Sequence, residues 1–446
     1  MNEVAFFELC EGLYQSLRGD EVLLCNLDGE DADYIRLTGN RIRQAGTVRS
    51  RRLSLDLIDG QRQARASGDL SDDRDLDLAQ TRTLIQRLRE RLPQLPDDPY
   101  LHYSTEPTSS HQVRAGDSDA GSEGGWDSAG ALADLINAAT GLDLVGIWAS
   151  GAMSAGFSSS LGHRHWHQSN SFNLDFSCYL QGDKAVKSNL SGMTWNPQAL
   201  EDKLAAVRRD LDILRRPPRV IPPGRYRACL APAAVSELLD LLAWGGFGLK
   251  DHRTAQTPLL RLARGERQLD PRITLREEHR RGLVPLFTPE GFVKPEALTL
   301  IAAGLYQDCL VDSRSAKEYD QTVNAGGEGP ESLDLAAGDI AAAEVFKRLD
   351  QGLAIGNLWY LNYADRNDCR ITGMTRFATF WVEAGEPVAP VEVMRFDDSL
   401  YHLLGDRLEG LTRERELLMS PDTYGGRSNA SALLPGVLVS GIDLKL

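Results

Sequence analysis

Three histidines at alternate positions are the residues in this sequence whose spacing most directly suggests chemistry. His163, His165 and His167 fall within the run HRHWHQS. If this run is a β-strand, the three imidazoles project from one face, because side chains alternate between the two faces of a strand. Imidazoles placed in this way can bind Zn²⁺ or Ni²⁺, with a water or a distant residue as the fourth ligand. The alternative is a polar strand face that binds no metal or only an adventitious one.

A polar loop near the middle of the chain is the second candidate site. It runs from Ser313 to Gly327, after a strand expected over 305–311, and it ends in the run TVNAGG. Adjacent glycines after an asparagine allow backbone amides to approach a bound group closely. The alternative is an ordinary surface turn. The residues expected to hold a peptide in this loop are Ser315, Thr322, Asn324, Gly326 and Gly327.

Motifs for phosphate binding and for a serine nucleophile are absent from the sequence. It contains no GxxxxGK[ST], GxGxxG or GxSxG run. The chain has 6 cysteines, and none of them forms a CxxC pair. Most of these cysteines lie among apolar neighbours, which is typical of reduced, buried thiols.

The composition argues against two classes of partner. The 446 residues include 49 Lys and Arg against 64 Asp and Glu, which gives a net charge of −15. Without a basic surplus, we do not expect a nucleic-acid binder dominated by phosphate contacts. No run approaches the roughly 18 apolar residues that a membrane-spanning helix needs. The first residues, MNEVAFFELCEGL, carry acids where a signal peptide has positive charge, so we expect a cytoplasmic protein.

Hydrophobic periodicity predicts the elements that position these residues in the first half of the chain. Apolar residues recur at helical spacing in some segments and alternate with polar residues in others. An Asp-Gly pair at 59–60 is expected to turn a hairpin, and the segment 93–125 has the composition of a loop or linker. The expected helices cover 4–17, 74–92, 127–139 and 197–216, and the expected strands cover 21–27, 32–37, 53–57, 144–149, 155–160, 164–169 and 173–180.

Four prolines between Pro217 and Gly224 mark an expected domain junction. We therefore divide the chain into an N-terminal domain, 1–216, and a C-terminal domain, 225–446. The second part opens with a short strand and a helix from Pro232 to Trp244, and the remainder is mostly β with polar or glycine breaks. The expected fold class is α+β.

Residues 304–326 carry a spaced pattern of small, apolar and polar residues. The residues concerned are Gly304, Leu310, Asp312, Ser315, Ala316, Thr322 and Gly326. The pattern resembles the central segment of the TldD/PmbA family, the metallopeptidase-related proteins called modulators of DNA gyrase. In that family the segment reads G-x-L-x-x-x-L-x-D/N-x-x-S/T-A, followed by a polar loop with a threonine and a glycine. Tyr306 departs from it by replacing the first leucine.

This resemblance implies a fold for the whole chain. Family members have an N-terminal α/β domain with an antiparallel sheet and helices, and a C-terminal β-rich, barrel-like domain. Weaker similarity extends from about Asp31 to the C-terminus, so we expect both parts here. The acidic charge of the chain gives no support to a role in DNA binding that the family name suggests.

The resemblance also implies where a catalytic metal would lie. Peptidase members carry His-Glu-x-x-x-His on the helix after the first strand of the second half, and a nearby cysteine completes the metal site. The corresponding helix here, 233–246, has no histidine, and its only carboxylates are Glu237 and Asp240. Two carboxylates alone are poor zinc ligands, so Cys369, near the family's cysteine, has nothing to complete. We therefore expect the non-catalytic PmbA (TldE) branch, with no metal and no cofactor.

The expected function is a peptide-binding subunit that acts in proteolysis or peptide maturation. The resemblance implies a homodimer, or a heterodimer with a HExxxH-bearing family member. Aromatic residues in short strand segments, 358–361 and 377–381, favour an exposed interface, although they could equally fill a core. One alternative is a divergent metallopeptidase that uses the His163, His165 and His167 cluster, and another is a structural or regulatory dimer.

Overall fold

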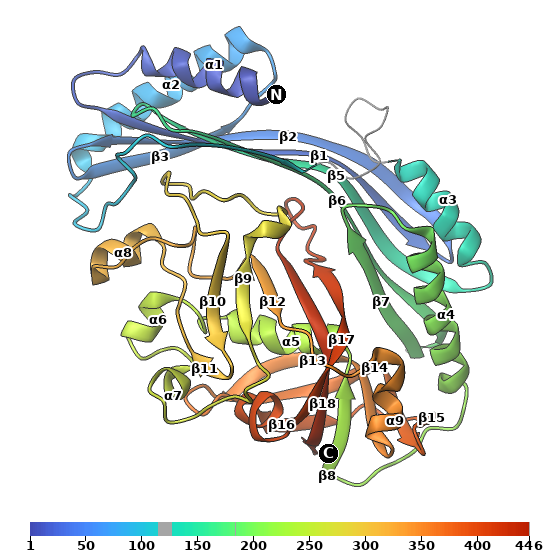
Figure 1. Cartoon of the computed structure of the whole chain (residues 1–446). Helices are drawn as coiled ribbons and strands as arrows, with labels where there is room; N and C mark the ends of the chain where they lie inside the picture. The colour runs from blue at the N-terminus through green and yellow to red at the C-terminus, as the bar shows by residue number, and fades with distance from the viewer. Residues whose placement is uncertain (115–126, 183, 446) are drawn as a thin grey trace.

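The strands of the chain form two sheets, one from each half. The computed structural model describes residues 1–114, 127–182 and 184–445. Among these residues, one sheet has seven strands and the other has eleven, and helices pack on both, so the fold is α+β. Figure 1 shows the seven-stranded sheet arching over the C-terminal half of the chain. Its concave face therefore looks toward the second half.

The seven-stranded sheet is built from long strands. They are β1 (Val22–Thr38), β2 (Arg41–Asp59), β3 (Arg62–Asp69), β4 (Ser109–Arg114), β5 (Asp143–Ser159), β6 (Arg164–Gln181) and β7 (Lys184–Gly192). The order is β3-β2-β1-β5-β6-β4, and β7 also pairs with β6. All neighbours are antiparallel except β4, which runs parallel to β6.

Several of these strands are longer than the sequence pattern predicts. The segments 21–27 and 32–37 belong to the single strand β1, and the four later segments form only β5 and β6. A small residue allows close strand approach here, because a Cβ on Gly29 would lie 2.3 Å from Ser154 Oγ. The pattern does not predict β4 or β7, and β4 lies within the expected loop. Residues 115–126 lie outside the described part of the chain.

Four predicted helices pack on the outer face of this sheet. They are α1 (Glu3–Tyr14), α2 (Arg74–Arg91), α3 (Ser128–Ala138) and α4 (Pro197–Leu214), and the short helix η1 (Leu92–Gln94) follows α2. Figure 1 shows α1 and α2 at one end of the sheet and α3 and α4 at the other. Asp73 and Asn196 begin α2 and α4, because their side chains accept hydrogen bonds from free amides of the first turn. The predicted Asp-Gly hairpin joins β2 to β3, with Gly60 at φ 60°.

The second half of the chain is rich in strands. Its strands are β8 (Gly224–Leu230), β9 (Leu275–Glu278), β10 (Ala297–Ala302), β11 (Leu305–Tyr306), β12 (Ser332–Leu335), β13 (Gly352–Asp365), β14 (Arg370–Glu383), β15 (Glu386–Pro390), β16 (Arg395–Ser399), β17 (Leu408–Met419) and β18 (Ser431–Leu444). Its helices are α5 (Pro232–Ala243), α6 (Leu249–Arg253), α7 (Leu260–Ala263), η3 (His279–Arg281), α8 (Ser313–Tyr319), η4 (Ala342–Glu344), α9 (Val345–Leu349) and η5 (His402–Asp406).

The eleven-stranded sheet is not closed as a barrel, which corrects the barrel-like form that the resemblance implies. Its order is β11-β10-β9-β12-β18-β16-β14-β13-β8, with β15 on β14 and β17 on β18. The row ends at β11, which pairs only with β10 among the described residues. At the other end, β8 pairs with both β13 and β18.

The apolar face of α5 lies in the main core of the second half. Val235, Leu238 and Leu242 are at most 1% exposed and pack with residues of β8, β13 and β18. The expected strand over 305–311 is wrong beyond Tyr306, and the first part of the expected polar loop is the helix α8. Asp312 begins that helix because its side chain accepts a hydrogen bond from a first-turn amide. No helix among the described residues is long and apolar enough to span a membrane.

Candidate functional site

A cavity of about 510 Å³ lies between the seven-stranded sheet and loops of the second half, and we call it the interlayer cavity. Its size is typical of pockets that hold small ligands. The lining residues from the first half are Asn26, Leu27, Asp28, Ser54, Arg65, 153–156 and His167. Those from the second half are 283–285, Phe287, Pro289, Lys294, Gly326, Glu331 and 427–430.

Two buried side chains of the second half join the walls of the interlayer cavity. Arg427 is 8% exposed, and its guanidinium donates to the carbonyl oxygens of Gly151 at 3.1 Å and Ser171 at 3.0 Å. Asn429 donates through Nδ2 to Ser169 Oγ at 2.7 Å. These bonds satisfy buried carbonyl and hydroxyl groups of β5 and β6, so they fix the loop before β18 against the sheet.

The wall formed by β1 and β2 is polar. Asn26 donates through Nδ2 to Pro289 O at 3.0 Å, which ties this wall to the opposite one. Burial raises the pKa of Asp28 above its usual range, while Arg52 on the neighbouring strand opposes that shift. The carboxyl group of Asp28 and the hydroxyl of Ser54 therefore present hydrogen-bonding groups to any chain that enters the interlayer cavity.

The three predicted histidines lie close together and are buried, with at most 3% of each residue exposed. The rings of His163 and His165 are 6.2 Å apart. Both nitrogens of all three rings lie within 3.3 Å of a hydrogen-bond partner in the protein. The partners are Ser159 and Ser104 for His163, Thr108 and Ser110 for His165, and Gln112 Oε1 and Leu283 O for His167. Both groups beside His167 are acceptors, so a neutral ring donates its single N–H to one of them.

These contacts give the histidines a packing role. Burial lowers the pKa of His165 and His167 to about 4, so both rings are neutral at pH 7. The ring of His165 stacks on Phe287 of the second half, with centroids 5.2 Å apart. The histidines therefore fasten the segment around Phe287 onto the sheet. A metal at this position would have to replace hydrogen bonds that are already made.

The five residues of the predicted peptide-binding loop lie in different surroundings. Ser315 is 3% exposed and donates through its hydroxyl to Glu328, and the side chain of Asn324 bonds to backbone groups on either side of Leu310. Thr322 is exposed. Of the five predicted residues, Gly326 lines the interlayer cavity, and Gly327 follows it. Among the described residues, the amides of these two glycines have no hydrogen-bond partner.

Helix α5 does not fit the metal that the resemblance implies for peptidase members. Glu237 and Asp240 are its only carboxylates, and burial raises the pKa of both. Cys369 is fully buried in the apolar core of the second half, where burial raises the pKa of its thiol to about 12. A protonated thiol in an apolar core is a poor metal ligand. The described chain therefore offers no imidazole or thiolate site on this helix.

A group of ligand residues that we did not predict lies behind the wall of the interlayer cavity. One ligand atom from each of Glu277, His279 and Glu331 lies within 4.8 Å of the other two. Burial raises the pKa of Glu277 to about 7. The Glu-x-His spacing at 277–279 was a usable signal in the sequence. Glu331 follows 52 residues later and carries no such signal, because only the pairing of β9 with β12 brings it close.

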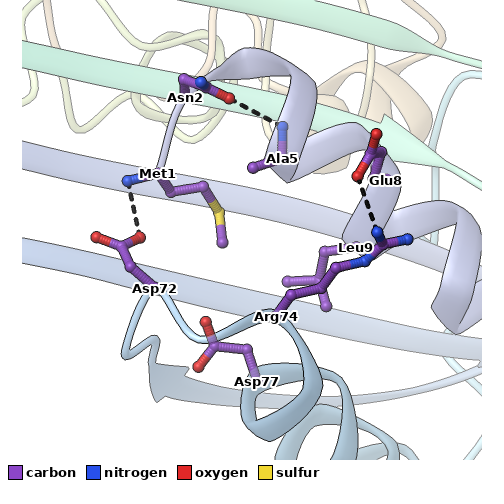
Figure 2. A pocket seen from close by; sticks show the side chains of 8 residues that line it. All are labelled: Met1, Asn2, Ala5, Glu8, Leu9, Asp72, Arg74 and Asp77. Carbon is purple, nitrogen blue, oxygen red and sulfur yellow. Dashed lines mark hydrogen bonds and ion pairs between the residues drawn. The ribbon is translucent and has the colours of Figure 1, made fainter.

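A separate pocket of about 450 Å³ lies between the starts of α1 and α2, shown in Figure 2. Four of its charged groups form two ion pairs, whereas Asp77 accepts hydrogen bonds from Ser71 through Oδ1. The amino group of Met1 lies 2.7 Å from Asp72, and Arg74 lies 3.4 Å from Glu8. The pocket lies on the outer side of the sheet, away from the interlayer cavity (Figure 1), and it brings together no histidine or cysteine.

The aromatic residues of β13 and β14 divide between core and surface. Phe380 and Trp381 are at most 7% exposed and belong to buried clusters. Trp359 is 44% exposed and Tyr360 is 71% exposed, and their rings contact edge to face at 4.5 Å. The guanidinium of Arg376 lies 4.4 Å from the ring centre of Trp359. We call Trp359, Tyr360 and Arg376 the β13–β14 patch.

Three solved structures share this architecture. TldE from Thermococcus kodakarensis is 15% identical, with a TM-score of 0.79 over 99% of this chain and 100% of that chain. A protein from Thermotoga maritima described as a modulator of DNA gyrase is 14% identical, with a TM-score of 0.74 over 99% and 100%. A Bacteroides thetaiotaomicron protein with the same description is 15% identical, with a TM-score of 0.74 over 100% and 98%. These likenesses establish the fold.

The sequence itself gives the family. No curated protein matches the chain. Residues 223–445 match the model of the PmbA/TldA metallopeptidase C-terminal domain, and this match covers half of the chain. It begins one residue before β8 and includes α5, the second-half loops that line the interlayer cavity, and β18. The chain therefore belongs to the TldD/PmbA family of metallopeptidase-related proteins.

Proposed function

We propose that this chain is a peptide-binding member of the family that does not cleave peptides itself. It acts in the cytoplasm, in proteolysis or peptide maturation, together with a metal-bearing relative. The observation that carries this proposal is α5, because the helix that corresponds to the metal-binding helix of peptidase members holds only Glu237 and Asp240. Without an imidazole or a thiolate, the helix cannot hold zinc in a usual protein geometry.

Peptide binding is supported by the interlayer cavity and by Gly326 and Gly327, which form its glycine edge. Gly326 borders the cavity, and a Cβ on it would lie 3.6 Å from Pro289 Cδ. A Cβ on Gly327 would have no neighbour within 4 Å. An extended peptide can therefore bond to their free amides, as in strand addition. Asp28 and Ser54 on the opposite wall would then bond to its other side.

The β13–β14 patch supports association with a partner. Exposed tryptophan and tyrosine beside an arginine are the residue types enriched in protein interfaces. Trp244, which is 64% exposed, is a second exposed aromatic residue and contacts Tyr363, which lies on β13 like Trp359. We propose that this surface binds either a second copy of the chain or a HExxxH-bearing family member.

Co-expression with a HExxxH-bearing family member tests the proposal. The purified chain alone should not cleave an unstructured fluorogenic peptide, whereas the mixture should cleave it faster than the relative alone. The substitution Trp359→Ala should weaken association about tenfold. Tyr424→Ala is the matched control, because Tyr424 is 98% exposed and lies on a different loop. Cleavage by the chain alone, or no association with either partner, would contradict the proposal.

A further inference from the structure

A compact set of ligand residues lies in the second half of the chain, away from α5. Glu277 is in β9, His279 begins η3 and Glu331 directly precedes β12. One ligand atom of each comes within 4.8 Å of the other two. Among the described residues, no other group of three or more histidine, cysteine or acidic residues brings its ligand atoms this close together. Three separate segments therefore converge on one point.

The ring of His279 is oriented as in protein metal sites. Its Nδ1–H donates to Pro295 O at 2.7 Å, which leaves Nε2 as the unprotonated nitrogen. That Nε2 faces the carboxylate of Glu277 and lies 3.6 Å from its Oε1. Metal-bound histidines usually donate the other ring N–H to a carbonyl or carboxylate, which fixes the tautomer. His279 is 2% exposed, so this orientation is also fixed by packing.

Glu277 supplies an independent indication of a ligand. Its Oε1 accepts hydrogen bonds from the backbone amides of Glu331 at 2.7 Å and Ser332 at 2.6 Å. Its Oε2 is buried and has no hydrogen-bond partner among the described residues. Glu277 as a whole is 2% exposed. A buried carboxylate oxygen without a partner is costly, and a cation bound to the Glu277 carboxylate would remove that cost.

One cation already lies beside this group without satisfying it. Lys294 donates through Nζ to Glu331 Oε2 at 2.5 Å, and its side chain is 1% exposed. This pair neutralises Glu331 but leaves Glu277 Oε2 unpartnered. The side chain of Glu331 is 42% exposed, and both Lys294 and Glu331 line the interlayer cavity. An ion can therefore enter from the cavity and keep one coordination position open to it.

We propose that Glu277, His279 and Glu331 form a binding site for a divalent transition-metal ion of the Zn²⁺ class. One imidazole and two carboxylates suit this class better than Mg²⁺ or Ca²⁺, which prefer oxygen ligands alone. Three protein ligands leave the fourth position for water or for a group of a bound ligand. The site goes beyond the proposed function and does not depend on it, because none of its residues lies on α5.

Zinc titration of the whole chain tests this site. Chelator-treated protein, dialysed at pH 7.5, is titrated with ZnCl₂ and followed by calorimetry. We expect one zinc per chain in the wild type and at least 100-fold weaker binding in Glu277→Gln. That variant keeps an oxygen for the two backbone amides, so circular dichroism should show an unchanged fold. His402→Gln is the matched control, because His402 forms a similar pair with Asp398 at 3.0 Å elsewhere and its loss should leave zinc binding unchanged.

The variant Lys294→Met shows whether the cation beside Glu277 and Glu331 is a bound metal or the ammonium group of Lys294. If the ammonium merely competes with the metal, this variant should bind zinc more tightly than the wild type. Zinc binding by Lys294→Met but not by the wild type would overturn the proposal, because the lysine would then be the resident cation. Binding in the wild type that Glu277→Gln leaves unchanged would also overturn it. Zinc-edge absorption of the wild-type complex does not depend on any variant folding, and it should give one imidazole with carboxylate oxygens at about 2.0–2.2 Å.

Discussion

Two histidine-bearing regions lie on opposite sides of the interlayer cavity, and they differ in the hydrogen-bond partners of their buried polar atoms. On one wall, each ring nitrogen of His163, His165 and His167 lies within 3.3 Å of a polar group of the protein. Behind the other wall, His279 keeps Nε2 directed toward Glu277, whose Oε2 has no partner among the described residues. The second region therefore keeps a buried carboxylate oxygen that the proposed cation would bind.

Ligand spacing in a sequence is therefore a weak guide to a site. Alternate histidines on a strand do share a face, as the pattern predicts, but serine, threonine and glutamine side chains beside them take up their nitrogens. The Glu277 group has no regular spacing, and its three members meet through strand pairing. The Glu277 group is distinguished by Glu277 Oε2, a buried carboxylate oxygen that has no hydrogen-bond partner among the described residues.

Acid pH should affect the first region most strongly. The pKa of His165 and His167 is lowered to about 4, against 6.5 in the unfolded chain. As pH falls below 6.5, the unfolded chain binds protons that the folded chain does not, so the free energy of unfolding decreases until about pH 4. The loss approaches roughly 3 kcal/mol for each histidine. Urea unfolding between pH 4.5 and 7.5 measures it.

A double variant with glutamine at both positions is the control for this pH dependence. His165→Gln with His167→Gln removes the two titrating rings and should flatten the slope between pH 4.5 and 6.5. An equally steep slope in this variant would mean that other groups cause the acid sensitivity.

Truncating His165 should give the next largest loss in the free energy of unfolding. His165→Ala leaves a space beside Phe287 and removes the partner of two hydroxyls, those of Thr108 and Ser110. We expect a loss of about 3 kcal/mol in the free energy of unfolding. Zinc affinity should not change. His111→Ala, at a side chain that is 60% exposed, should change stability by less than about 0.5 kcal/mol. A lower zinc affinity in His165→Ala would contradict this expectation, because His165 would then contribute to zinc binding.

Much of the fold could be predicted from the sequence, because local patterns determine helices. Helical periodicity predicts α2 and α4 to within a few residues, and the structure shows Asp73 and Asn196 as their N-caps. Strand lengths were the main error. Small and polar residues such as Gly29 look like breaks in the sequence, whereas between two long neighbours they remain paired. The barrel-like form failed because closure depends on which distant strands pair, and no local pattern records that.

The site was predicted less well than the fold. The sequence indicates the central loop as a candidate site, but the side chains of Ser315 and Asn324 are bonded to Glu328 and to the backbone beside Leu310, which spacing alone cannot reveal. Arg427 was missed because it lies in a polar run that reads as an ordinary turn. Its role depends on carbonyl groups of β5 and β6, more than 250 residues earlier in the chain. Interfaces between halves are set by such long-range contacts.

Filling the space between the two regions should give a smaller and more local effect. In Gly326→Val, the new side chain would enter the interlayer cavity beside Pro289. We expect about 30-fold weaker binding of an unstructured peptide, measured by fluorescence anisotropy, because the glycine edge can no longer be approached. Gly329→Val is the matched control, since a Cβ there has no neighbour within 4 Å and the residue is exposed. Equal peptide affinity in both variants would place the peptide elsewhere.

The most direct test of the comparison is a zinc-edge anomalous difference map from a zinc-soaked crystal of the whole chain. We expect one strong peak between Glu277, His279 and Glu331, with the imidazole ring of His279 as the nitrogen ligand. A peak among His163, His165 and His167, or beside Glu237 and Asp240 on α5, would contradict it. So would a map with no peak at any of these positions.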